Sequence, residues 1–469
     1  MTAVIAVDLG ATSVRVILGY VDRSGLRLNQ ISRIPNLPVS TPDGLHWNTL
    51  QLFSSVIGGL VDATNVEPDA VSVGVDSWGV DYGLLRGNRL LGIPHHYRDD
   101  RTTETIRQVH AKVNEAALYR RSGVQSLPIN TVYQLQSEAN QGWLELADTV
   151  LMTPDLFNYW LCGSRFGERT IASTTGLLDP FLGEWDIPLI DMLGFPERIF
   201  PELVPVGTFL GPVLPNLGLK SAPIVTSIGS HDTASAVVAV PSTTNDFVYI
   251  SCGTWALIGV ETPSPILTDS SRVAGFTNET GVDGRNRFQQ TTTGLWLLNE
   301  SIRTWKAAGF SAELAELLEA AAGIQGPVAV FDVRDPRFLP PGNIPGRISI
   351  WCREHGQPVP RTAAEFVRSI LESLATAFAT GVRQVVEISV SSCRTIHIVG
   401  GGSQNALLCQ LTSNLTGLPV IAGPVEATAI GNIMIQARAH GMVSGTLEGL
   451  RSIVAATSEL HTYLPGGGK

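Results

Sequence analysis

The chain contains very little lysine and lacks the motif in which a lysine usually holds a phosphate. Four of its 32 basic residues are lysines, and none stands in a G-x-x-x-x-G-K-[ST] string. In that string, backbone amides and the lysine together cradle the phosphates of a bound nucleotide. The sequence therefore excludes this class of ATP-binding protein.

Cysteines and long apolar runs are scarce as well. The five cysteines are an odd number without C-x-x-C spacing, which argues against a disulfide framework and against a zinc site. The first apolar run carries Asp8 and has no basic region before it, so it predicts a strand rather than a signal peptide. No stretch reaches the ~20 apolar residues that a membrane-spanning helix needs. We therefore expect a cytoplasmic protein without a membrane partner.

Positive charge is in deficit too. The formal net charge is −10, which argues against nucleic acid and acidic membrane surfaces as partners. A content of 44% hydrophobic and 16% charged residues is typical of a well-packed globular protein, and 469 residues predict two or three domains.

Two short turns rich in glycine and hydroxyl groups stand about half a chain apart. The first covers residues 8–13 (DLGATS) and the second covers residues 250–255 (ISCGTW). Each lies between two apolar runs, a pattern that predicts two β-hairpins. Hydroxyls and turn amides can hold phosphate oxygens, and Asp8 is placed to hold hydrated Mg²⁺. The repetition predicts two related domains that face one nucleotide, and a linker at 241–246 separates the predicted domains 1–240 and 241–469.

A βαβ unit is predicted in the second half of the chain. A strand at 395–399 leads into a triple-glycine turn at 400–402, a helix closed by Gly417, and a strand at 418–422. Because position 405 is asparagine, the turn lacks the G-x-G-x-x-G spacing of dinucleotide-binding folds. The glycines either let the backbone approach a flat ligand or make a tight turn for packing. One face of the helix is expected to carry Leu407, Leu408, Leu411 and Leu415.

Polar loops follow two predicted strands in the first half. After the strand at 224–227, Asp232 can take a proton from a substrate hydroxyl beside His231, or it can cap the next helix. After the strand at 70–75, the string Trp78-Gly79-Val80-Asp81 offers an aromatic face and a carboxylate to a sugar, although a lone tryptophan is more often part of a core. Residues 95–101 (HHYRDDR) can form a metal or anion site, but a solvated charged loop is favoured.

These strings, taken together, resemble the FGGY carbohydrate kinases. The match runs in order through AVDLGATSVR, VGVDSWGVDYGLL, YRDDRT, GSHDTASAVVAVP, SCGTWALIG and HIVGGGSQN, and it covers nearly the whole chain up to about Asn432. The strings SHDTASAV and GPVEATAIGN are most similar to the rhamnulokinases of that family, which phosphorylate L-rhamnulose. The resemblance implies an α/β, actin-like (ribonuclease-H-like) fold in two domains, with ATP and sugar in a cleft between them.

The resemblance also implies roles for particular residues. Asp232 is expected to accept the proton from the sugar, while Asp8 remains the expected metal-binding residue from its position in the first turn. The expected sugar contacts are Gly79, His231 and Thr291. The expected ATP-binding residues are Ala11, Thr12, Ser13, Val14, Arg15, Thr254, Asn299 and Gly401.

Three of these positions depart from the pattern of the family. Val14 stands where the family has glycine, and a β-branched residue there suits the start of a strand. Thr291 replaces an asparagine that contacts the sugar, so the details of sugar recognition stay open. Asn299 replaces a longer glutamine that contacts the nucleotide, a change that a bridging water can accommodate.

The function that the resemblance implies is ATP- and Mg²⁺-dependent phosphorylation of L-rhamnulose at its 1-hydroxyl, in L-rhamnose catabolism. A kinase for another ketose or polyol, such as L-fuculose or xylulose, is the nearest alternative. A non-catalytic, actin-like nucleotide-binding regulator is a second alternative, against which Asp232 in its full sequence context argues. An NAD-dependent enzyme is excluded by the missing dinucleotide fingerprint.

Overall fold

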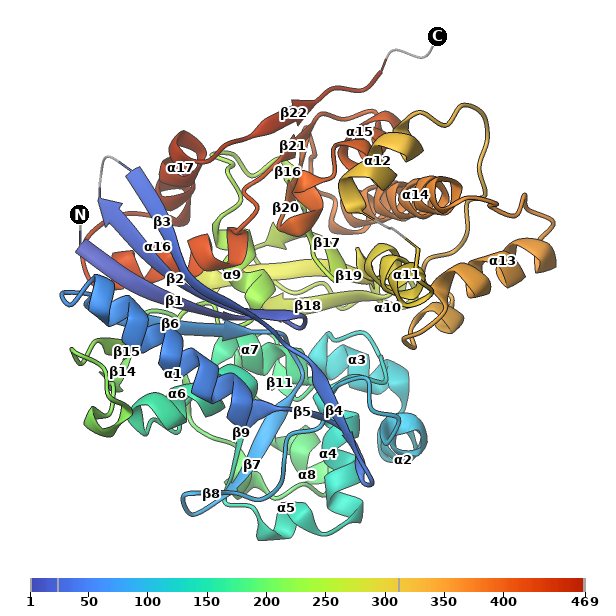
Figure 1. Cartoon of the computed structure of the whole chain (residues 1–469). Helices are drawn as coiled ribbons and strands as arrows, with labels where there is room; N and C mark the ends of the chain where they lie inside the picture. Colours follow the sequence, from blue (N-terminus) through green and yellow to red (C-terminus); the bar gives the residue numbers. More distant parts are fainter. Residues whose placement is uncertain (1, 23–24, 311–312, 467–469) are drawn as a thin grey trace. The chain divides into compact units, whose positions relative to one another are not determined.

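The computed structural model describes residues 2–22, 25–310 and 313–466 (Figure 1). Its contacts divide the chain into two compact units, which are described separately below. Unit 1 contains Met1–Thr243, Glu261–Phe288 and Ala427–Thr457. Unit 2 contains Thr244–Val260, Gln289–Glu426 and Ser458–Lys469. The first break falls close to the predicted linker, but two segments from the second half of the chain belong to unit 1; the division into domains 1–240 and 241–469 stays a prediction.

Unit 1 is built on a six-stranded sheet with the order β14-β15-β6-β1-β2-β3. The predicted first hairpin is confirmed, because β1 (Thr2–Leu9) and β2 (Ser13–Asp22) pair antiparallel. β6 (Ser72–Ser77) runs parallel to β1, and β15 (Ile224–Thr226) runs parallel to β6. The carboxyl ends of these three strands therefore meet at one edge of the sheet, where open α/β sheets usually bind ligands. The outer strands are β3 (Gly25–Pro35) and β14 (Phe209–Pro212).

Two helices pack tightly on this sheet and on each other. They are α9 (Asp232–Val238) and α16 (Ala427–Ala439). A Cβ atom on Gly431 of α16 would lie 1.8 Å from the backbone oxygen of Ser235 in α9, so only glycine allows this approach. A Cβ atom on Gly19 of β2 would lie 2.5 Å from Ile433. Small residues thus set how closely α16 lies against both neighbours.

Buried polar contacts hold the late segments of unit 1 to the early one. Arg451 of α17 (Leu447–Thr457) is fully buried, lies 2.7 Å from a carboxylate oxygen of Glu261, and donates to the backbone oxygen of Val237. On α16, the Asn432 amide donates to Asp76 on β6 at 2.6 Å. A buried arginine needs such a partner, so these contacts fix which segments fold together.

The rest of unit 1 is a mainly helical subdomain with its own apolar core. A small sheet in the order β8-β7-β9 supports it. Its strands and helices, with the hairpin and helix that precede them, are β4 (Pro38–Thr41), β5 (Gly44–Trp47), α1 (Thr49–Val66), β7 (Tyr82–Arg86), β8 (Arg89–Leu90), α2 (Thr102–Lys112), α3 (Glu115–Ser122), α4 (Thr131–Asn140), α5 (Trp143–Leu146), β9 (Thr149–Met152), α6 (Thr153–Cys162), α7 (Arg169–Ala172), α8 (Ile187–Leu193), α10 (Asp269–Val273) and β18 (Phe276–Thr280).

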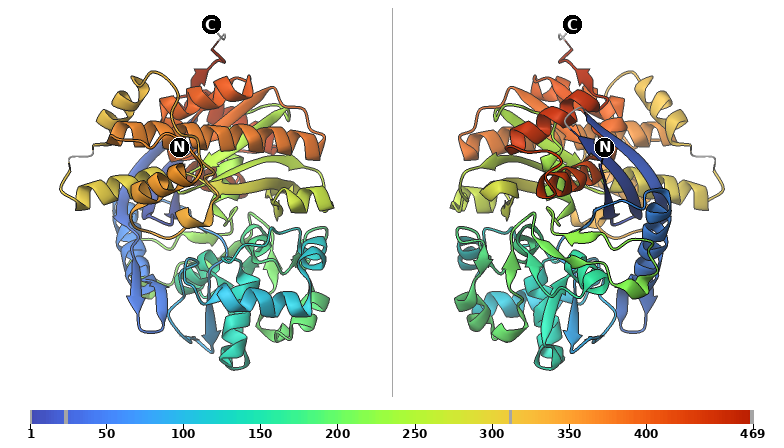
Figure 2. Two further views of the ribbon diagram at one scale, coloured as in Figure 1. Left: turned by 90° about the vertical axis from the view of Figure 1, so that its right-hand side faces the viewer. Right: turned by 90° about the vertical axis from the view of Figure 1, so that its left-hand side faces the viewer.

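Unit 2 contains six of the seven strands of a mixed sheet, in the order β19-β17-β16-β20-β21-β22. The predicted second hairpin is confirmed, because β16 (Phe247–Cys252) and β17 (Trp255–Thr262) pair antiparallel. Figure 2 shows α14 (Ala363–Ser389) as the long orange helix of this unit. The other elements are β19 (Asn286–Thr293), α11 (Trp296–Ala307), α12 (Leu314–Ala322), α13 (Ile344–Glu354), β20 (Thr395–Val399), α15 (Ala406–Thr416), β21 (Val420–Ala422) and β22 (His461–Tyr463).

The predicted βαβ unit is confirmed. β20 and β21 pair parallel, α15 lies between them in the chain, and Gly417 ends the helix with a φ of 70°. On the predicted leucine face, Leu408 and Leu411 are buried, whereas Leu415 is 44% exposed, so only part of that face is covered. Leu415 lies in the last turn of α15, where the helix leaves the core.

The remaining expectations from composition can be compared with the described residues. All five cysteines are free thiols, and burial raises the pKa of Cys252 and of Cys409 to about 12.

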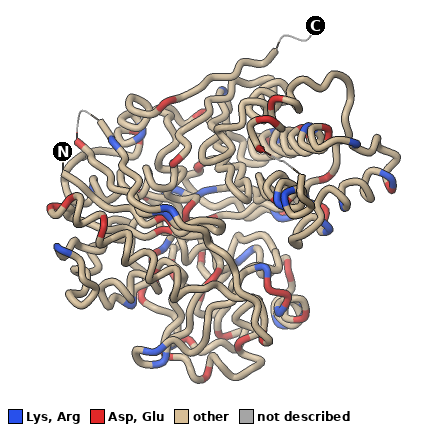
Figure 3. The backbone as a smooth tube through the Cα atoms, in the orientation of Figure 1, with Lys and Arg blue, Asp and Glu red and all other residues tan. Residues whose placement is uncertain are grey.

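Figure 3 shows blue Lys and Arg segments interspersed with red Asp and Glu segments along the described chain. Of the helices that the structure describes, none combines the length and the apolar content needed to cross a bilayer.

Candidate active site

Three carboxylates gather at the edge of the unit 1 sheet where the parallel strands end. Asp8 near the end of β1 and Asp76 near the end of β6 are register partners, and both are buried. The loop after β15 joins the same edge, because Ser77 and His231 form a parallel bridge and Ser77 N–H donates to Ser230. Asp232 follows at the first position of α9, with 33% of its side chain exposed. Asp232 is thus the accessible carboxylate of the three.

The electrostatics of this edge favour a positive charge. Burial, with a further contribution from neighbouring Asp8, raises the pKa of Asp76 well above its usual value. Asp76 Oδ1 is buried without a hydrogen-bond partner among the described residues, while Oδ2 accepts from Asn432. Arg15 Nη1 lies 3.4 Å from Asp8 Oδ2 across the hairpin. Oxygen atoms of this kind are the ligands that Mg²⁺ prefers.

The turn of the first hairpin is fixed by backbone hydrogen bonds and by Asn36. The Gly10 amide donates to the Ser13 oxygen at 3.0 Å, and Asn36 braces the turn by hydrogen bonds to the backbones of Gly10 and Thr12, also at 3.0 Å. Ala11 and Thr12 lie at the tip, and Thr12 is exposed. The Ser13 hydroxyl is buried and has no partner among the described residues. An unpaired buried hydroxyl is costly, and it fits a site that a polar ligand completes.

The start of α9 distinguishes the two interpretations of Asp232, as a proton acceptor or as a helix cap. The capping position of α9 is His231 rather than Asp232, and it makes no side-chain capping hydrogen bond. The capping alternative for Asp232 is therefore wrong. The described contacts of its carboxylate are Thr233 Oγ1 at 3.1 Å and His231 Nε2 at 3.3 Å.

A buried ion pair stands behind His231. Nδ1 of His231 lies 2.9 Å from Glu279 Oε2 and 3.1 Å from Arg287 Nη2, and Arg287 in turn donates to Glu279 at 2.8 Å. All three side chains are buried, and Arg287 is completely so. No role was predicted for Glu279 and Arg287, because they lie on strands some fifty residues beyond Asp232 and no local pattern connects them to it. This arrangement fixes the imidazole ring beside Asp232.

The glycine at position 79 lies in a strained loop. Val80 has a φ of 69°, which β-branched residues rarely adopt. Its amide donates to Thr174 Oγ1, and its carbonyl accepts from Thr131 Oγ1 at 2.6 Å. A Cβ atom on Gly79 would lie 3.1 Å from Thr174. Strain that the surroundings hold in place is common at binding loops.

Asp81 does not have the sugar-gripping role that the sequence suggested. It is fully buried and accepts hydrogen bonds from the indoles of Trp47 and Trp78, the amide of Tyr97 and the side chain of Gln134. Burial raises its pKa to about 6, against the effect of these donors. Trp78 is itself buried against Trp47, with ring centroids 3.9 Å apart. Both side chains therefore belong to the support of the loop.

The segment 95–101 is not the solvated loop that was favoured. His96 is buried and stacks on Trp47, and burial lowers its pKa to about 3. Arg101 donates to Glu138 at 2.5 Å and to Gln134 at 2.6 Å. Burial and the Arg101 charge lower the pKa of His95 to about 4. The charged side chains find partners inside the subdomain. The polar sequence alone had suggested that they face solvent.

Unit 2 brings its own predicted residues together. The amides of Gly294 and Trp296 donate to the Thr254 carbonyl, and the amide of Leu295 donates to the Gly253 carbonyl. The triple-glycine turn lies beside the same hairpin, because Cβ atoms on Gly400 and Gly402 would lie 3.1 Å and 2.4 Å from atoms of Cys252. Packing thus explains two of the three glycines. Gly401 is exposed, and a Cβ atom on it would meet Leu295 only at 3.9 Å.

The two departures in unit 2 stand on either side of Gly294-Leu295 in the chain. Asn299 is exposed in the first turn of α11, directly after the Gly294-Leu295 contact. Thr291 is half-buried on β19. The triple-glycine turn and the start of α11 thus pack against the second hairpin, but no described contact joins Thr291 to that hairpin.

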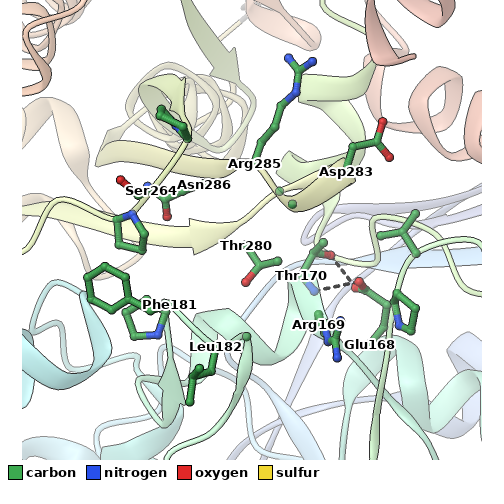
Figure 4. Close-up of a pocket in the computed structure, with 18 residues that line it drawn as sticks. Glu168, Arg169, Thr170, Phe181, Leu182, Ser264, Thr280, Asp283, Arg285 and Asn286 are labelled. Atoms are coloured by element: carbon green, nitrogen blue, oxygen red, sulfur yellow. Dashed lines mark hydrogen bonds between the residues drawn. The ribbon is translucent and has the colours of Figure 1, made fainter. Parts of the chain in front are cut away.

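A separate cavity of about 360 Å³ lies within unit 1 (Figure 4). Glu168 and Thr170 form one wall and also accept from the amides of Ser230 and His231, so the cavity borders the loop between β15 and α9. Phe181 and Leu182 line the opposite side. None of the predicted site residues lines it.

Comparisons with known proteins identify what this chain resembles. The N-terminal domain of the FGGY family of carbohydrate kinases matches residues 3–239, and the C-terminal domain of that family matches residues 248–440. A rhamnulokinase from Pectobacterium carotovorum subsp. carotovorum is 40% identical, with 98% of this chain and 93% of that protein covered. A rhamnulokinase from Bacteroides thetaiotaomicron is 36% identical, with 98% and 95% covered.

Solved structures agree on the fold. A ligand-bound xylulose kinase from Lactobacillus acidophilus superimposes with a TM-score of 0.80 at 16% identity, over 99% of this chain and 94% of that one. A glycerol kinase from Plasmodium falciparum with ADP gives a TM-score of 0.77 at 12% identity, over 99% and 94%. The predicted two-domain α/β fold is confirmed.

Proposed function

Because this chain belongs to the FGGY family of carbohydrate kinases, we propose that it phosphorylates L-rhamnulose at the 1-hydroxyl. The hydroxyl oxygen bonds to the γ-phosphorus of ATP while the bond to the β-phosphate oxygen breaks. The products are L-rhamnulose 1-phosphate, ADP and a proton. The observation that carries this proposal is the identity of 36–40% to rhamnulokinases over 98% of the chain. A sugar-catabolic kinase that uses ATP belongs in the cytoplasm.

Asp232 is the proposed proton acceptor. It is the only one of the three gathered carboxylates with a third of its side chain exposed, so a sugar hydroxyl can reach it. His231 orients it and contacts the sugar, and the other proposed sugar contacts are Gly79 in unit 1 and Thr291 in unit 2. A positioned general base contributes roughly 10²–10⁴ in rate.

The first hairpin is proposed to hold phosphate oxygens through the segment from Ala11 to Arg15. Its exposed tip and the unpaired Ser13 hydroxyl support this role. Val14 is buried on β2 and contributes its backbone. In unit 2 the proposed nucleotide contacts are Thr254, Asn299 and Gly401. Phosphoryl transfer needs mainly positioning and charge stabilisation, which hydroxyls and amides can provide.

The carboxylates at the sheet edge fit a bound Mg²⁺. Asp8 would hold it, with Asp76 beside it, since Asp76 Oδ1 is buried and unpaired and two neighbouring carboxylates disfavour each other's charge. Bound Mg²⁺ neutralises the charge that builds up on the transferring phosphoryl group. Lysine is scarce, so Arg15 is the nearby side-chain cation that this chain offers.

The test is ADP release from purified protein with MgATP and a panel of sugars. L-rhamnulose is expected to give the highest kcat/KM, with little ADP formed in its absence. A higher kcat/KM for L-fuculose or xylulose would move the assignment to the alternative that Thr291 leaves open. ATP binding without stimulation by any sugar of the panel would favour the non-catalytic regulator.

A further inference from the structure

Two histidines and an aspartate of unit 1 form a cluster outside the proposed active site. One ring nitrogen each of His46 and His95 and a carboxylate oxygen of Asp43 lie within 4.8 Å of one another. The imidazole rings have centroids 4.2 Å apart. Neither His46 nor Asp43 carries a role in the proposed kinase reaction.

His46 is prepared to act as a metal ligand. Its Nδ1 lies 3.0 Å from the Ile93 carbonyl, which can only accept, so Nδ1 carries the proton and Nε2 carries the lone pair. The side chain is 3% exposed, and Nε2 has no hydrogen-bond partner among the described residues. A histidine whose second nitrogen donates to a carbonyl is the usual arrangement in metal sites.

The distance from His46 to Asp43 suits coordination. Nε2 of His46 lies 3.4 Å from Asp43 Oδ1. With metal–ligand bonds of ~2.1 Å, this separation corresponds to a bond angle of roughly 110° at the metal, close to tetrahedral. The Asp43 side chain is 74% exposed in the turn between β4 and β5, so water can supply further ligands.

The backbone places the two histidines side by side. His46 on β5 and His95 form an antiparallel bridge, flanked by hydrogen bonds from His96 N–H to the Leu45 oxygen and from Trp47 N–H to the Pro94 oxygen. Opposed residues of such a bridge project to the same face. The geometry of the pair is therefore set by main-chain contacts before any ion binds.

His95 has a competing partner. Arg101 Nη1 lies 2.8 Å from its Nδ1, and a neutral imidazole has one lone pair, so a metal must take that lone pair from Arg101. Arg101 then keeps Glu138 and Gln134 as acceptors. Glu138 Oε1 also lies 3.8 Å from His95 Nδ1, so it must move closer to accept from an N–H there if the metal binds Nε2.

We propose that Asp43, His46 and His95 bind a divalent transition metal of the Zn²⁺ class, which clamps the β4–β5 hairpin to the segment that begins at His95. Two imidazoles and one carboxylate are a donor set that Zn²⁺ prefers and Mg²⁺ does not. The clamped elements carry Trp47 and Tyr97, which both donate to Asp81 below the Gly79 loop. No cysteine takes part, so the cysteine spacing gave no hint of this site.

The experiment is equilibrium dialysis of chelator-treated protein against Zn²⁺ in the presence of excess Mg²⁺, without nucleotide. The parent is expected to bind one Zn²⁺ per chain and to show a higher thermal midpoint with Zn²⁺. Asp43→Asn keeps the exposed side chain's size and removes its charge, so the zinc affinity is expected to fall ~10-fold or more. Its thermal midpoint without zinc is expected to match the parent.

Glu459→Gln is the matched control. Glu459 Oε1 lies 3.4 Å from His461 Nε2, the same separation as in the Asp43–His46 pair, but on an exposed segment without a second histidine in the cluster. This variant is expected to bind zinc like the parent. Absence of zinc binding by the parent, or equal affinity in the parent and Asp43→Asn, overturns the proposal. Neither result depends on kinase activity.

Discussion

The carboxylate of Glu279 lies 2.9 Å from Nδ1 of His231, and both side chains are buried. Arg287 lies against the same two groups, with Nη2 2.8 Å from Glu279. Glu279 can only accept, so it is the natural acceptor for Arg287 and for a proton on His231 Nδ1. The Nε2 atom of His231 then faces Asp232 at 3.3 Å. A buried ion pair thus controls the orientation of the residue beside the proposed base.

Changing Glu279 to glutamine is expected to lower both stability and turnover. The amide keeps the size but leaves the fully buried Arg287 without its anionic partner, which costs ~3 kcal/mol of the free energy of unfolding. A less firmly held His231 should lower kcat ~10-fold and raise the KM for sugar, while the KM for ATP stays unchanged. Urea denaturation and steady-state kinetics well below the thermal midpoint measure the two effects.

Glu313→Gln is the control for that comparison. Glu313 pairs with Lys306 at 2.9 Å, but both side chains are more than half exposed, so the change should cost less than ~0.5 kcal/mol. If Glu279→Gln loses stability with kcat and both KM values intact, Glu279 has no positioning role.

Asp232→Asn is expected to remove turnover and leave the fold intact. Asparagine can still accept a hydrogen bond from a sugar hydroxyl, but it cannot take the proton, so kcat should fall ~10²–10⁴-fold. Asp232 does not cap α9, and a third of its side chain is exposed, so the thermal midpoint and the affinity for ATP should stay close to those of the parent. Near-normal kcat in this variant would move the search for the base to Asp76.

The sequence predicted those parts of the molecule that local patterns determine. Both hairpins and the βαβ unit follow from apolar runs broken by glycine turns, and they form at the expected residues. The partners of the site residues come from far along the chain: Asn432 reaches Asp76 across 356 positions. Such pairings depend on which helix packs on which strand, and no local pattern encodes them.

Two polar segments were misinterpreted for the same reason, because their hydrogen-bond partners are distant in the chain. Asp81 and the segment after His95 are polar, so they suggested ligand contact or solvent exposure. Their hydrogen-bond partners lie in separate segments: Trp47 precedes them and Gln134 follows them. A polar side chain can contact a ligand or solvent only when the fold gives it no other hydrogen-bond partner. Its partners come from distant segments, so they are known only once the whole fold is known.

Gly431→Ala is expected to be severely destabilising, whereas Gly449→Ala is not. A Cβ atom on Gly431 would meet the Ser235 backbone at 1.8 Å, so α16 must move away from α9, the helix that begins at Asp232. We expect a loss of more than ~3 kcal/mol and reduced kcat. Gly449 lies in α17 with nothing within 4 Å of such an atom, so alanine should stabilise by ~0.5–1 kcal/mol. Equal thermal midpoints for the two variants would contradict this packing.

His96 is expected to make the protein less stable in mild acid. Its pKa is lowered from 6.5 to about 3, chiefly by burial, with Arg98 adding to the effect. Below pH ~6.5 the unfolded chain therefore binds a proton that the folded chain does not, so stability is full above that pH and falls as the pH drops toward the folded pKa. One such group contributes a slope of ~1.4 kcal/mol per pH unit.

The variant His96→Asn isolates this contribution. Asparagine can still accept from the Arg98 amide but does not titrate, so the variant should be less stable than the parent near neutral pH through lost stacking on Trp47. The difference between the two should shrink by ~1.4 kcal/mol for each pH unit below ~6.5. Asp81, whose raised pKa of about 6 acts with the opposite sign, is present in both proteins and cancels in the difference.

Urea denaturation of both proteins at several pH values down to ~4 measures that slope. A variant with the exposed His461 changed to asparagine is the control. A difference between parent and His96→Asn that does not change with pH would show that His96 is protonated in the folded protein, and would place it outside the buried cluster around Trp47.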